Sequence, residues 1–179
     1  MQPHDAVVYD LDGTLVRLPV DWGAVERALA DCAVDAGIDP EGHTAWELLD
    51  AGEAAGVGDE MEALIAEHER AGARESTRLP HADRIPEDRP VGVCSLNCEA
   101  ACRTALDRND LAGHVEAVVG RDTVPERKPD PAPLAAALAP LGVAPGDALF
   151  VGDSPADAEA AEAAGLAFRW VEGAGPADD

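Results

Sequence analysis

The chain has 179 residues, of which 46% are hydrophobic, and 36 acidic against 13 basic residues give it a formal net charge of −23. Its length and apolar content predict one globular domain, with or without a small insert, and exclude a disordered protein. The charge excludes nucleic acid and anionic membranes as partners, and no apolar run approaches the ~20 residues of a membrane-spanning helix.

The chain begins with a polar segment that leads into an apolar stretch with β-branched residues. Residues 1–5 contain neither a basic region nor an apolar signal core, so we expect a soluble cytoplasmic protein. Residues 5–9 are predicted to form a buried strand, and Asp10 and Asp12 follow at its carboxyl end, before Gly13. Carboxylates there are costly to desolvate unless a cation or a reaction requires them. An Asp-Gly hairpin turn is the structural alternative.

Residues 17–79 break the alternation of strands and helices that the rest of the chain shows. Apolar residues at helical spacing predict helices in this block, and no strand is expected there. The predicted helices cover 22–36, 41–55 and 59–74. We therefore predict a core domain of residues 1–16 and 80–179, with residues 17–79 as an all-helical insert between its first and second strands.

After a proline-rich linker at 80–90, strands and helices alternate to the end of the chain. The predicted strands cover 91–95, 115–119, 148–151 and 166–171. The predicted helices cover 99–111, 131–139 and 155–164, with Asn97 available to cap the first of them. This alternation predicts an α/β fold with a parallel sheet and helices on both faces. Residues 173–179 are expected to form a frayed acidic tail.

Polar side chains follow several of these strands, and parallel strands bring such residues to one edge of the sheet. The candidates are Asp10, Asp12, Ser95, Lys128, Asp153 and Asp157. Three carboxylates of this kind can hold Mg²⁺, which prefers oxygen ligands. An ionised aspartate can attack phosphorus, a neighbouring carboxylic acid can transfer protons, and a lysine and a hydroxyl can stabilise phosphoryl oxygens.

Lys128 is the most informative of these residues, because it is the only lysine in the chain. A composition that avoids lysine indicates a specific role for the exception, and a surface lysine without a role is the alternative. Ser95 can instead be a turn residue, and Asp153 and Asp157 can be acids that the helix dipole favours at a helix start.

In order along the chain, these motifs resemble the four signature motifs of the haloacid dehalogenase-like hydrolases. Asp10-Leu11-Asp12-Gly13-Thr14 is similar to the first motif, Ser95 to the second, Lys128-Pro129 to the third, and Gly152-Asp153 with Asp157 to the fourth. The insert resembles the type 1 cap of this family. The resemblance implies a Rossmann-like core and a Mg²⁺-dependent phosphatase for a small phosphorylated metabolite, most similar to phosphoglycolate phosphatases.

The resemblance also implies a role for each residue. Asp10 would be the nucleophile that forms an aspartyl-phosphate, and Asp12 the general acid/base. Asp10, the backbone carbonyl of Asp12 and Asp153 would hold Mg²⁺, with Asp157 supporting the metal site. Ser95 and Lys128 would bind the phosphoryl group. Relatives often carry asparagine directly after the Ser or Thr of the second motif, so a phosphate-binding role for Asn97, one position later, stays open.

Several activities of the family can be compared with these residues. Dehalogenases lack the second aspartate, which is present here as Asp12, and phosphonatases need a cap lysine, which residues 17–79 lack. A sugar phosphomutase on the same core and a non-catalytic module that binds a phospho-ligand or a protein remain alternatives. Arg17 lies just after the catalytic loop and is the candidate to bind an acidic group of the substrate. The small size of the insert predicts a small substrate.

Two compositional features concern the environment of the protein. The acidity, the abundance of alanine and the single lysine resemble proteins of salt-in halophiles, so we expect a requirement for high salt, which screens self-repulsion. The four cysteines form no Cys-x-x-Cys pair, and we expect them to be small buried residues in a reducing compartment. They are Cys32, Cys94, Cys98 and Cys102.

Overall fold

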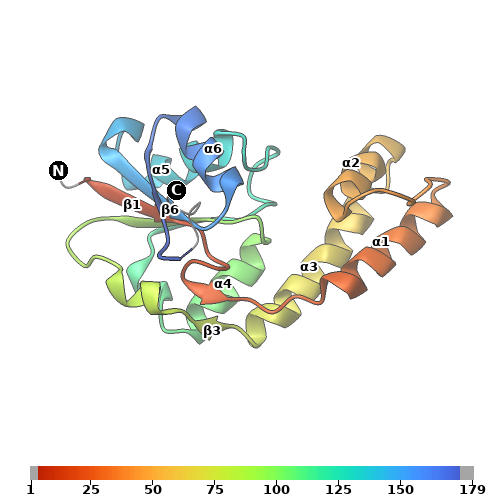
Figure 1. The fold of residues 1–179 in the computed structure, drawn as a ribbon, viewed down its shortest axis with the longest axis horizontal. Coiled ribbons are helices and arrows are strands. Elements are labelled where there is room, and N and C mark those ends of the chain that lie inside the picture. The colour runs from red at the N-terminus through yellow and green to blue at the C-terminus, as the bar shows by residue number, and fades with distance from the viewer. Residues whose placement is uncertain (1–3, 174–179) are drawn as a thin grey trace.

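The computed structural model describes residues 4–173. They form a five-stranded sheet in the order β5-β4-β1-β6-β7, and every neighbouring pair of strands is parallel (Figure 1). The strands are β1 (Ala6–Tyr9), β4 (Val91–Cys94), β5 (Ala117–Val119), β6 (Ala148–Gly152) and β7 (Ala167–Trp170). This confirms the predicted α/β fold.

Helices lie on both faces of the sheet, because successive side chains of a strand point to opposite sides. On one face, Val8 and Phe150 pack against residues of α5 (Ala132–Leu138) and α6 (Pro155–Ala164). On the other face, Val7 and Tyr9 belong to the cluster that includes the buried residues of α4 (Glu99–Arg108). Both faces of β1 are therefore buried, which accounts for its uninterrupted apolar sequence.

The strand register brings the carboxyl ends of the central strands to one edge. Tyr9, the last residue of β1, lies beside Val93 of β4 and Val151 of β6. The residues that follow these positions include Asp10, Ser95 and Asp153. The parallel topology thus places three separate sequence motifs at the same edge of the sheet.

Three helices form an arm that extends to one side of the sheet domain (Figure 1). They are α1 (Trp22–Asp35), α2 (Ala45–Ala55) and α3 (Gly58–Arg74). The arm has its own apolar core, in which Leu29, Leu49 and Ile65 are fully or almost fully buried. Helix α2 begins four residues later than predicted, because the Thr44 side chain accepts a hydrogen bond from the backbone of Glu47 and starts the helix there.

The expectation of no strand between 17 and 79 was wrong at both borders of this segment. Strands β2 (Val16–Arg17) and β3 (Thr77–Arg78) pair in an antiparallel ribbon where the chain leaves the sheet domain and returns to it. Two residues are too few to show the alternation by which a strand is recognised in a sequence. The extent of the insert, residues 17–79, remains a prediction.

The predicted cap of α4 was also wrong. Cys98, not Asn97, precedes the helix, and the Asn97 side chain donates to Ser95 instead. The helix ends at Arg108, before the predicted residue 111. Short 3₁₀ turns occupy several connections, at Pro80–Arg84, Ala112–His114, Ala139–Leu141 and Pro145–Asp147.

Two further expectations concern the ends of the chain and the membrane. The predicted tail lies, apart from Gly173, outside the described residues. Within residues 4–173, no helix combines the length and the apolar character that crossing a membrane requires. Cys94, Cys98 and Cys102 are buried as expected, whereas Cys32 is only partly buried.

Candidate active site

The site is organised around the amine of Lys128, which is buried between two carboxylates. Its Nζ lies 2.8 Å from Oδ1 of Asp10 and 2.6 Å from Oδ1 of Asp157, and it also donates to the backbone carbonyl of Cys94 at 3.0 Å. Asp10 follows β1, Cys94 ends β4, and Asp157 lies in the first turn of α6. The single lysine therefore connects three segments that are far apart in the sequence.

Burial and charge act in opposite directions on these groups. Burial raises the pKa of Asp10, the positive charge of Lys128 lowers it, and the net result is a pKa of about 7. Burial lowers the pKa of Lys128, but the negative charges of Asp10 and Asp157 outweigh it and raise this pKa above its ordinary value. Lys128 is therefore positively charged at neutral pH, and its charge favours the ionised form of Asp10.

Three carboxylates at this edge could hold a metal ion. One oxygen each of Asp10, Asp153 and Asp157 can be chosen so that all lie within 4.8 Å of one another. Two glycines allow this packing, because a Cβ on Gly13 would lie 2.0 Å from a carboxylate oxygen of Asp153 and one on Gly152 would lie 2.6 Å from Asp157. An all-oxygen set of hard, negatively charged donors fits Mg²⁺ better than softer metals.

Asp12 lies in the same loop as Asp10, but its side chain binds a backbone group and not Lys128. Its Oδ1 accepts a hydrogen bond from the backbone of Leu18 at 2.8 Å, and its side chain is not part of the three-carboxylate group. Burial raises the pKa of Asp12, although the Leu18 hydrogen bond and Arg17 lower it in part. A raised pKa favours a carboxyl group that can carry a proton, as a general acid requires.

Arg17 is exposed on β2 and lies beside the site, not in its buried centre. It lines a surface hollow together with Gly13, Thr14 and Asp153. Its charge acts on Asp12. The structure thus brings Arg17 close to the loop of residues 10–15, and among the described residues it shows no hydrogen bond or ion pair of Arg17 with Lys128 or Asp10.

Ser95 and Asn97 form a buried turn directly after β4. The Ser95 hydroxyl accepts hydrogen bonds from the backbone nitrogen of Asn97 at 3.2 Å and from its Nδ2 at 3.3 Å. The preceding carbonyl, that of Cys94, holds Lys128. Asn97 therefore orients the Ser95 hydroxyl, which the sequence did not indicate.

A cavity of about 490 Å³ adjoins Lys128 and is bounded by residues from both the sheet domain and the helical arm. Trp46 of α2 forms one wall, and Leu96 and Arg127 line the cavity from the sheet domain. Arg127 pairs with Asp50 of α2, and its guanidinium lies 5.8 Å from the centre of the Trp46 ring. The arm thus contributes an aromatic wall to the space next to the buried amine.

A buried ion cluster that the sequence analysis missed joins the arm to the Ser95 turn. Arg121 donates to Glu62 at 2.7 Å and to Glu69 at 3.0 Å, both on α3, and also to the carbonyl of Leu96. Glu69 in turn accepts from the backbone nitrogen of Cys98 at 2.9 Å. Glu62 and Glu69 are 59 and 52 residues from Arg121, and Glu69 is 29 residues from Cys98, so no local pattern indicates these contacts.

Comparison with known proteins agrees with this geometry. Residues 86–171 match the family model described as haloacid dehalogenase-like hydrolase. A phosphoglycolate phosphatase of Cereibacter sphaeroides (strain ATCC 17025 / ATH 2.4.3) is 35% identical over 194 residues, which cover 93% of this chain and 85% of that protein. One of Rhodospirillum rubrum is 50% identical over 76 residues, which cover 42% of this chain and 32% of that protein.

Solved structures show the same fold. A HAD phosphatase from Thermococcus onnurineus aligns with a TM-score of 0.63 at 21% identity, over 97% of this chain and 89% of that one. CbbY from Rhodobacter sphaeroides, solved in complex with phosphate, aligns with a TM-score of 0.62 at 19% identity, over 95% and 87% of the two chains. With a 35% identical relative aligned over most of both proteins, this chain belongs to the haloacid dehalogenase-like hydrolase family and is an enzyme of that family.

Proposed function

We propose that the protein is a Mg²⁺-dependent phosphatase that hydrolyses a small, phosphoglycolate-like phosphomonoester through an aspartyl-phosphate. The observation that carries the proposal is the buried Lys128 amine held between Asp10 and Asp157, next to Asp153. A buried cation that faces a carboxylate can hold the oxygens of a phosphoryl group against that carboxylate. The relatives named phosphoglycolate phosphatase support the same activity.

In the first step, a carboxylate oxygen of Asp10 attacks phosphorus, and the bond between phosphorus and the ester oxygen breaks. The proton of Asp12 passes to the leaving oxygen, so that the product departs as an alcohol. Lys128 and the Ser95 hydroxyl bind the phosphoryl oxygens and stabilise their negative charge. The burial that raises the pKa of Asp12 suits it to carry the proton that this step requires.

In the second step, Asp12 removes a proton from water, and the resulting hydroxide attacks phosphorus. The bond between phosphorus and Asp10 breaks, which releases inorganic phosphate and restores the Asp10 carboxylate. Asp12 thereby regains the proton that it donated in the first step. One residue can serve both steps because it lies in the same loop as the nucleophile, with its side chain held by Leu18.

Asp10, Asp153 and the backbone carbonyl of Asp12 would hold Mg²⁺, with Asp157 supporting the site. When bound, the ion supplies positive charge that offsets the charge of the phosphoryl group and the carboxylates. Asp157 contributes by holding Lys128 and by capping its own helix, where its Oδ2 accepts from the Ser154 hydroxyl at 2.7 Å.

The substrate would place its organic part in the cavity between Lys128 and Trp46. The arginine in that cavity, Arg127, and the one beside the catalytic loop, Arg17, are the candidates to bind a carboxylate on the substrate. Trp46 limits the size of the group that can enter. These features favour a short acidic phosphomonoester, and we place the reaction in the cytoplasm, where such metabolites occur.

The test is the release of inorganic phosphate from a panel of phosphomonoesters that includes 2-phosphoglycolate, with Mg²⁺ in molar KCl. We expect release by the wild-type protein, and loss to background in Asp10→Asn and in chelator. Arg103→Gln, which changes an ion pair on α4 that includes none of these motif residues, is the matched control and should keep full activity. Release that persists in Asp10→Asn contradicts the proposal, and transfer of phosphate within a sugar phosphate supports a phosphomutase instead.

A further inference from the structure

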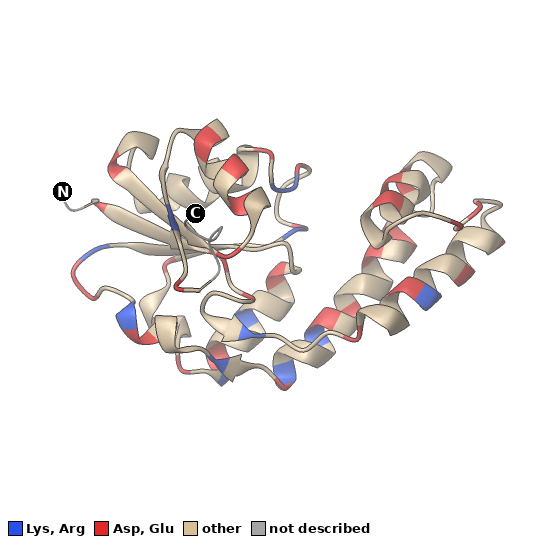
Figure 2. Cartoon of the chain, viewed as in Figure 1, with Lys and Arg blue, Asp and Glu red and all other residues tan. Residues whose placement is uncertain are grey.

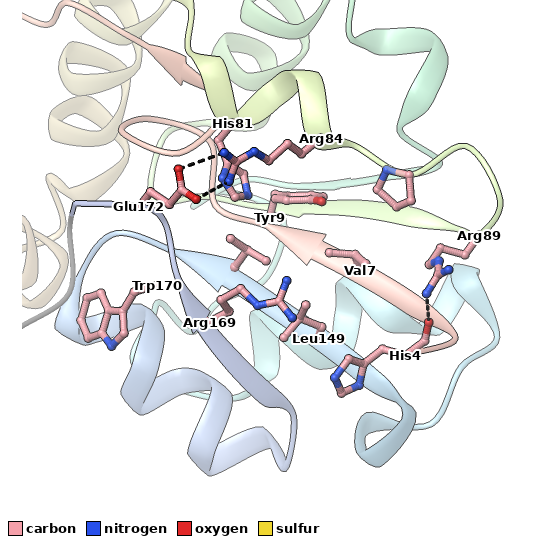
Figure 3. A pocket seen from close by; sticks show the side chains of 12 residues that line it. His4, Val7, Tyr9, His81, Arg84, Arg89, Leu149, Arg169, Trp170 and Glu172 are labelled. Atoms are coloured by element: carbon pink, nitrogen blue, oxygen red, sulfur yellow. Dashed lines mark hydrogen bonds and ion pairs between the residues drawn. The ribbon is translucent and has the colours of Figure 1, made fainter. Parts of the chain in front are cut away.

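A second hollow, which Lys128 does not line, lies on the face of the sheet that packs against α4; Figure 3 shows the side chains around it. Helix α4 contacts β5, which is the edge strand opposite β7. The surface over β1 and β6 is surrounded by side chains from loops and from β7. Val7 and Tyr9 of β1 and Leu149 and Val151 of β6 form its floor. Its volume of about 420 Å³ is within the ~300–1,000 Å³ range of small-molecule pockets.

Positive charge gathers around this hollow. Arg84, Arg89 and Arg169 line it, as do His4 and His81, and Glu172 is the acidic residue among the lining side chains (Figure 3). The whole chain has 13 basic residues and a formal net charge of −23. In so acidic a protein, three arginines over one apolar floor form a local site that attracts anions.

Arg169 and Arg84 are available to a ligand, whereas Arg89 is held by Asp88 and by the backbone carbonyl of His4. Within residues 4–173, Arg169 forms no ion pair, and it is exposed. Arg84 pairs with Glu172 at 2.7 Å, with both side chains more than half exposed. Exposed pairs contribute ~0–1 kcal/mol, so an incoming anion can replace Glu172 on Arg84 at little cost.

Arg169 and Arg84 lie near the aromatic part of the floor, whereas Arg89 lies at the end of the hollow next to His4 (Figure 3). The charge of Arg169 acts on both the Tyr9 hydroxyl and the His81 imidazole, and the charge of Arg89 acts on Tyr9. Tyr9 and His81 also stack edge to face, with ring centres 5.9 Å apart. An anionic group held by Arg169 would therefore lie beside a flat, largely apolar surface.

We propose that this hollow binds a small organic anion with a flat apolar body, whose anionic group lies between Arg169 and Arg84 and whose body covers Tyr9. The site is separate from the proposed phosphatase site, because Asp10 and Lys128 do not line it. It adjoins the hollow that contains Gly13 and Asp153, and the two share His81, Arg84 and Glu172. The proposal does not depend on the proposed function.

The probe is adenosine 5′-monophosphate, which has an anionic group and a flat body, titrated by calorimetry in chelator at the salt concentration that keeps the protein folded. We expect binding that Arg169→Gln weakens by about tenfold or more, as loss of a charge-assisted hydrogen bond predicts. Arg103→Gln removes the same charge from an exposed pair on α4 and should leave the affinity unchanged.

The location is tested by two aromatic NMR signals. One is the ring of Tyr9, the one tyrosine of the chain, which lies in the floor of this hollow, and the other is the indole of Trp46, which lines the cavity next to Lys128. The Trp46 signal is assigned with Trp46→Phe, and we expect the probe to shift the Tyr9 signals and not that of Trp46. A bound anion also favours protonated His81, so the His81 pKa should rise when the probe is added.

Several results would overturn the proposal. These are no binding at millimolar probe, a shift of Trp46 alone, or an affinity that Arg169→Gln leaves unchanged. Sedimentation velocity provides the last test. If Arg169→Gln dissociates a dimer without changing the affinity for the probe, this face is an interface between copies of the chain and not an anion site.

Discussion

At the scale of single residues, the site depends on the one lysine of the chain. Lys128 neutralises part of the charge of Asp10 and Asp157, which are both buried, and its amine makes three hydrogen bonds. A buried carboxylate without such a partner is strongly unfavourable. Arginine, which the composition otherwise prefers, is larger and planar and presents its donors differently from the compact ammonium group. The geometry of the site thus explains why this chain, which otherwise uses arginine, has a lysine at position 128.

Lys128→Met should lower the free energy of unfolding by about 3–5 kcal/mol in chelator, because it leaves two carboxylates buried without a cation. The loss should grow with pH. A carboxyl whose pKa is raised by folding lowers the free energy of unfolding as the pH rises from the pKa of the unfolded state to that of the folded state. In the wild type this decrease ends once the pH passes the pKa of folded Asp10, which is about 7. Without Lys128 the folded pKa is higher, so the decrease continues above that pH.

Urea unfolding at about pH 6 and about pH 8.5 measures this difference, since Lys128 is protonated in both folded and unfolded wild type over that range. Arg103→Gln serves as the control and should change stability by less than ~1 kcal/mol at either pH. An equal loss for Lys128→Met at the two pH values would show that Asp10 is not sensitive to Lys128.

At the scale of elements, the features that could be predicted from the sequence are those that depend on a local pattern of residues. The alternation of strands and helices and the position of motifs after strands were sufficient for the α/β fold and for the group of Asp10, Lys128 and Asp153. Strands β2 and β3 were missed because each has two residues. The capping role of Asn97 was wrong because its side chain turns back to Ser95, a choice that depends on how the turn packs. The Arg121 cluster was missed because Arg121 lies in a turn, whereas Glu62 and Glu69 lie on α3, 59 and 52 residues away in the sequence.

That cluster should couple α3 to the Ser95 turn. Arg121→Met leaves Glu69, which is fully buried, without its cation and should cost about 3–5 kcal/mol of unfolding free energy. Adding Glu69→Gln removes the stranded charge, so the double variant should recover part of the loss, with a coupling of about 0.5–3 kcal/mol. Thermal or urea unfolding of the two single variants and the double variant measures this coupling.

The matched comparison is the exposed pair of Arg103 and Glu99 on α4, for which the same cycle should give less than ~1 kcal/mol. If the Arg121 and Glu69 substitutions are simply additive, the two side chains do not stabilise one another and the contact between the arm and the turn depends on apolar packing alone.

At the scale of the whole molecule, the dominant feature is the distribution of negative charge. Figure 2 shows acidic residues on helices of both the sheet domain and the helical arm. Several of the positive side chains are already engaged in ion pairs, as are Arg121, Arg127 and Lys128. The remaining acids repel one another over the surface, and compact folding brings them closer together than in the unfolded chain.

Salt should therefore stabilise the folded protein. Raising KCl from about 0.1 M to molar concentration shortens the Debye length from ~10 Å to ~3 Å, which screens repulsion between surface carboxylates but leaves the buried Lys128 and Arg121 pairs almost unchanged. We expect the thermal midpoint to rise over this range and the gain to be smaller at a pH low enough to protonate the surface acids. Differential scanning calorimetry measures both. A midpoint that does not change with KCl would show that self-repulsion does not limit stability, and the halophile-like composition would then need another explanation.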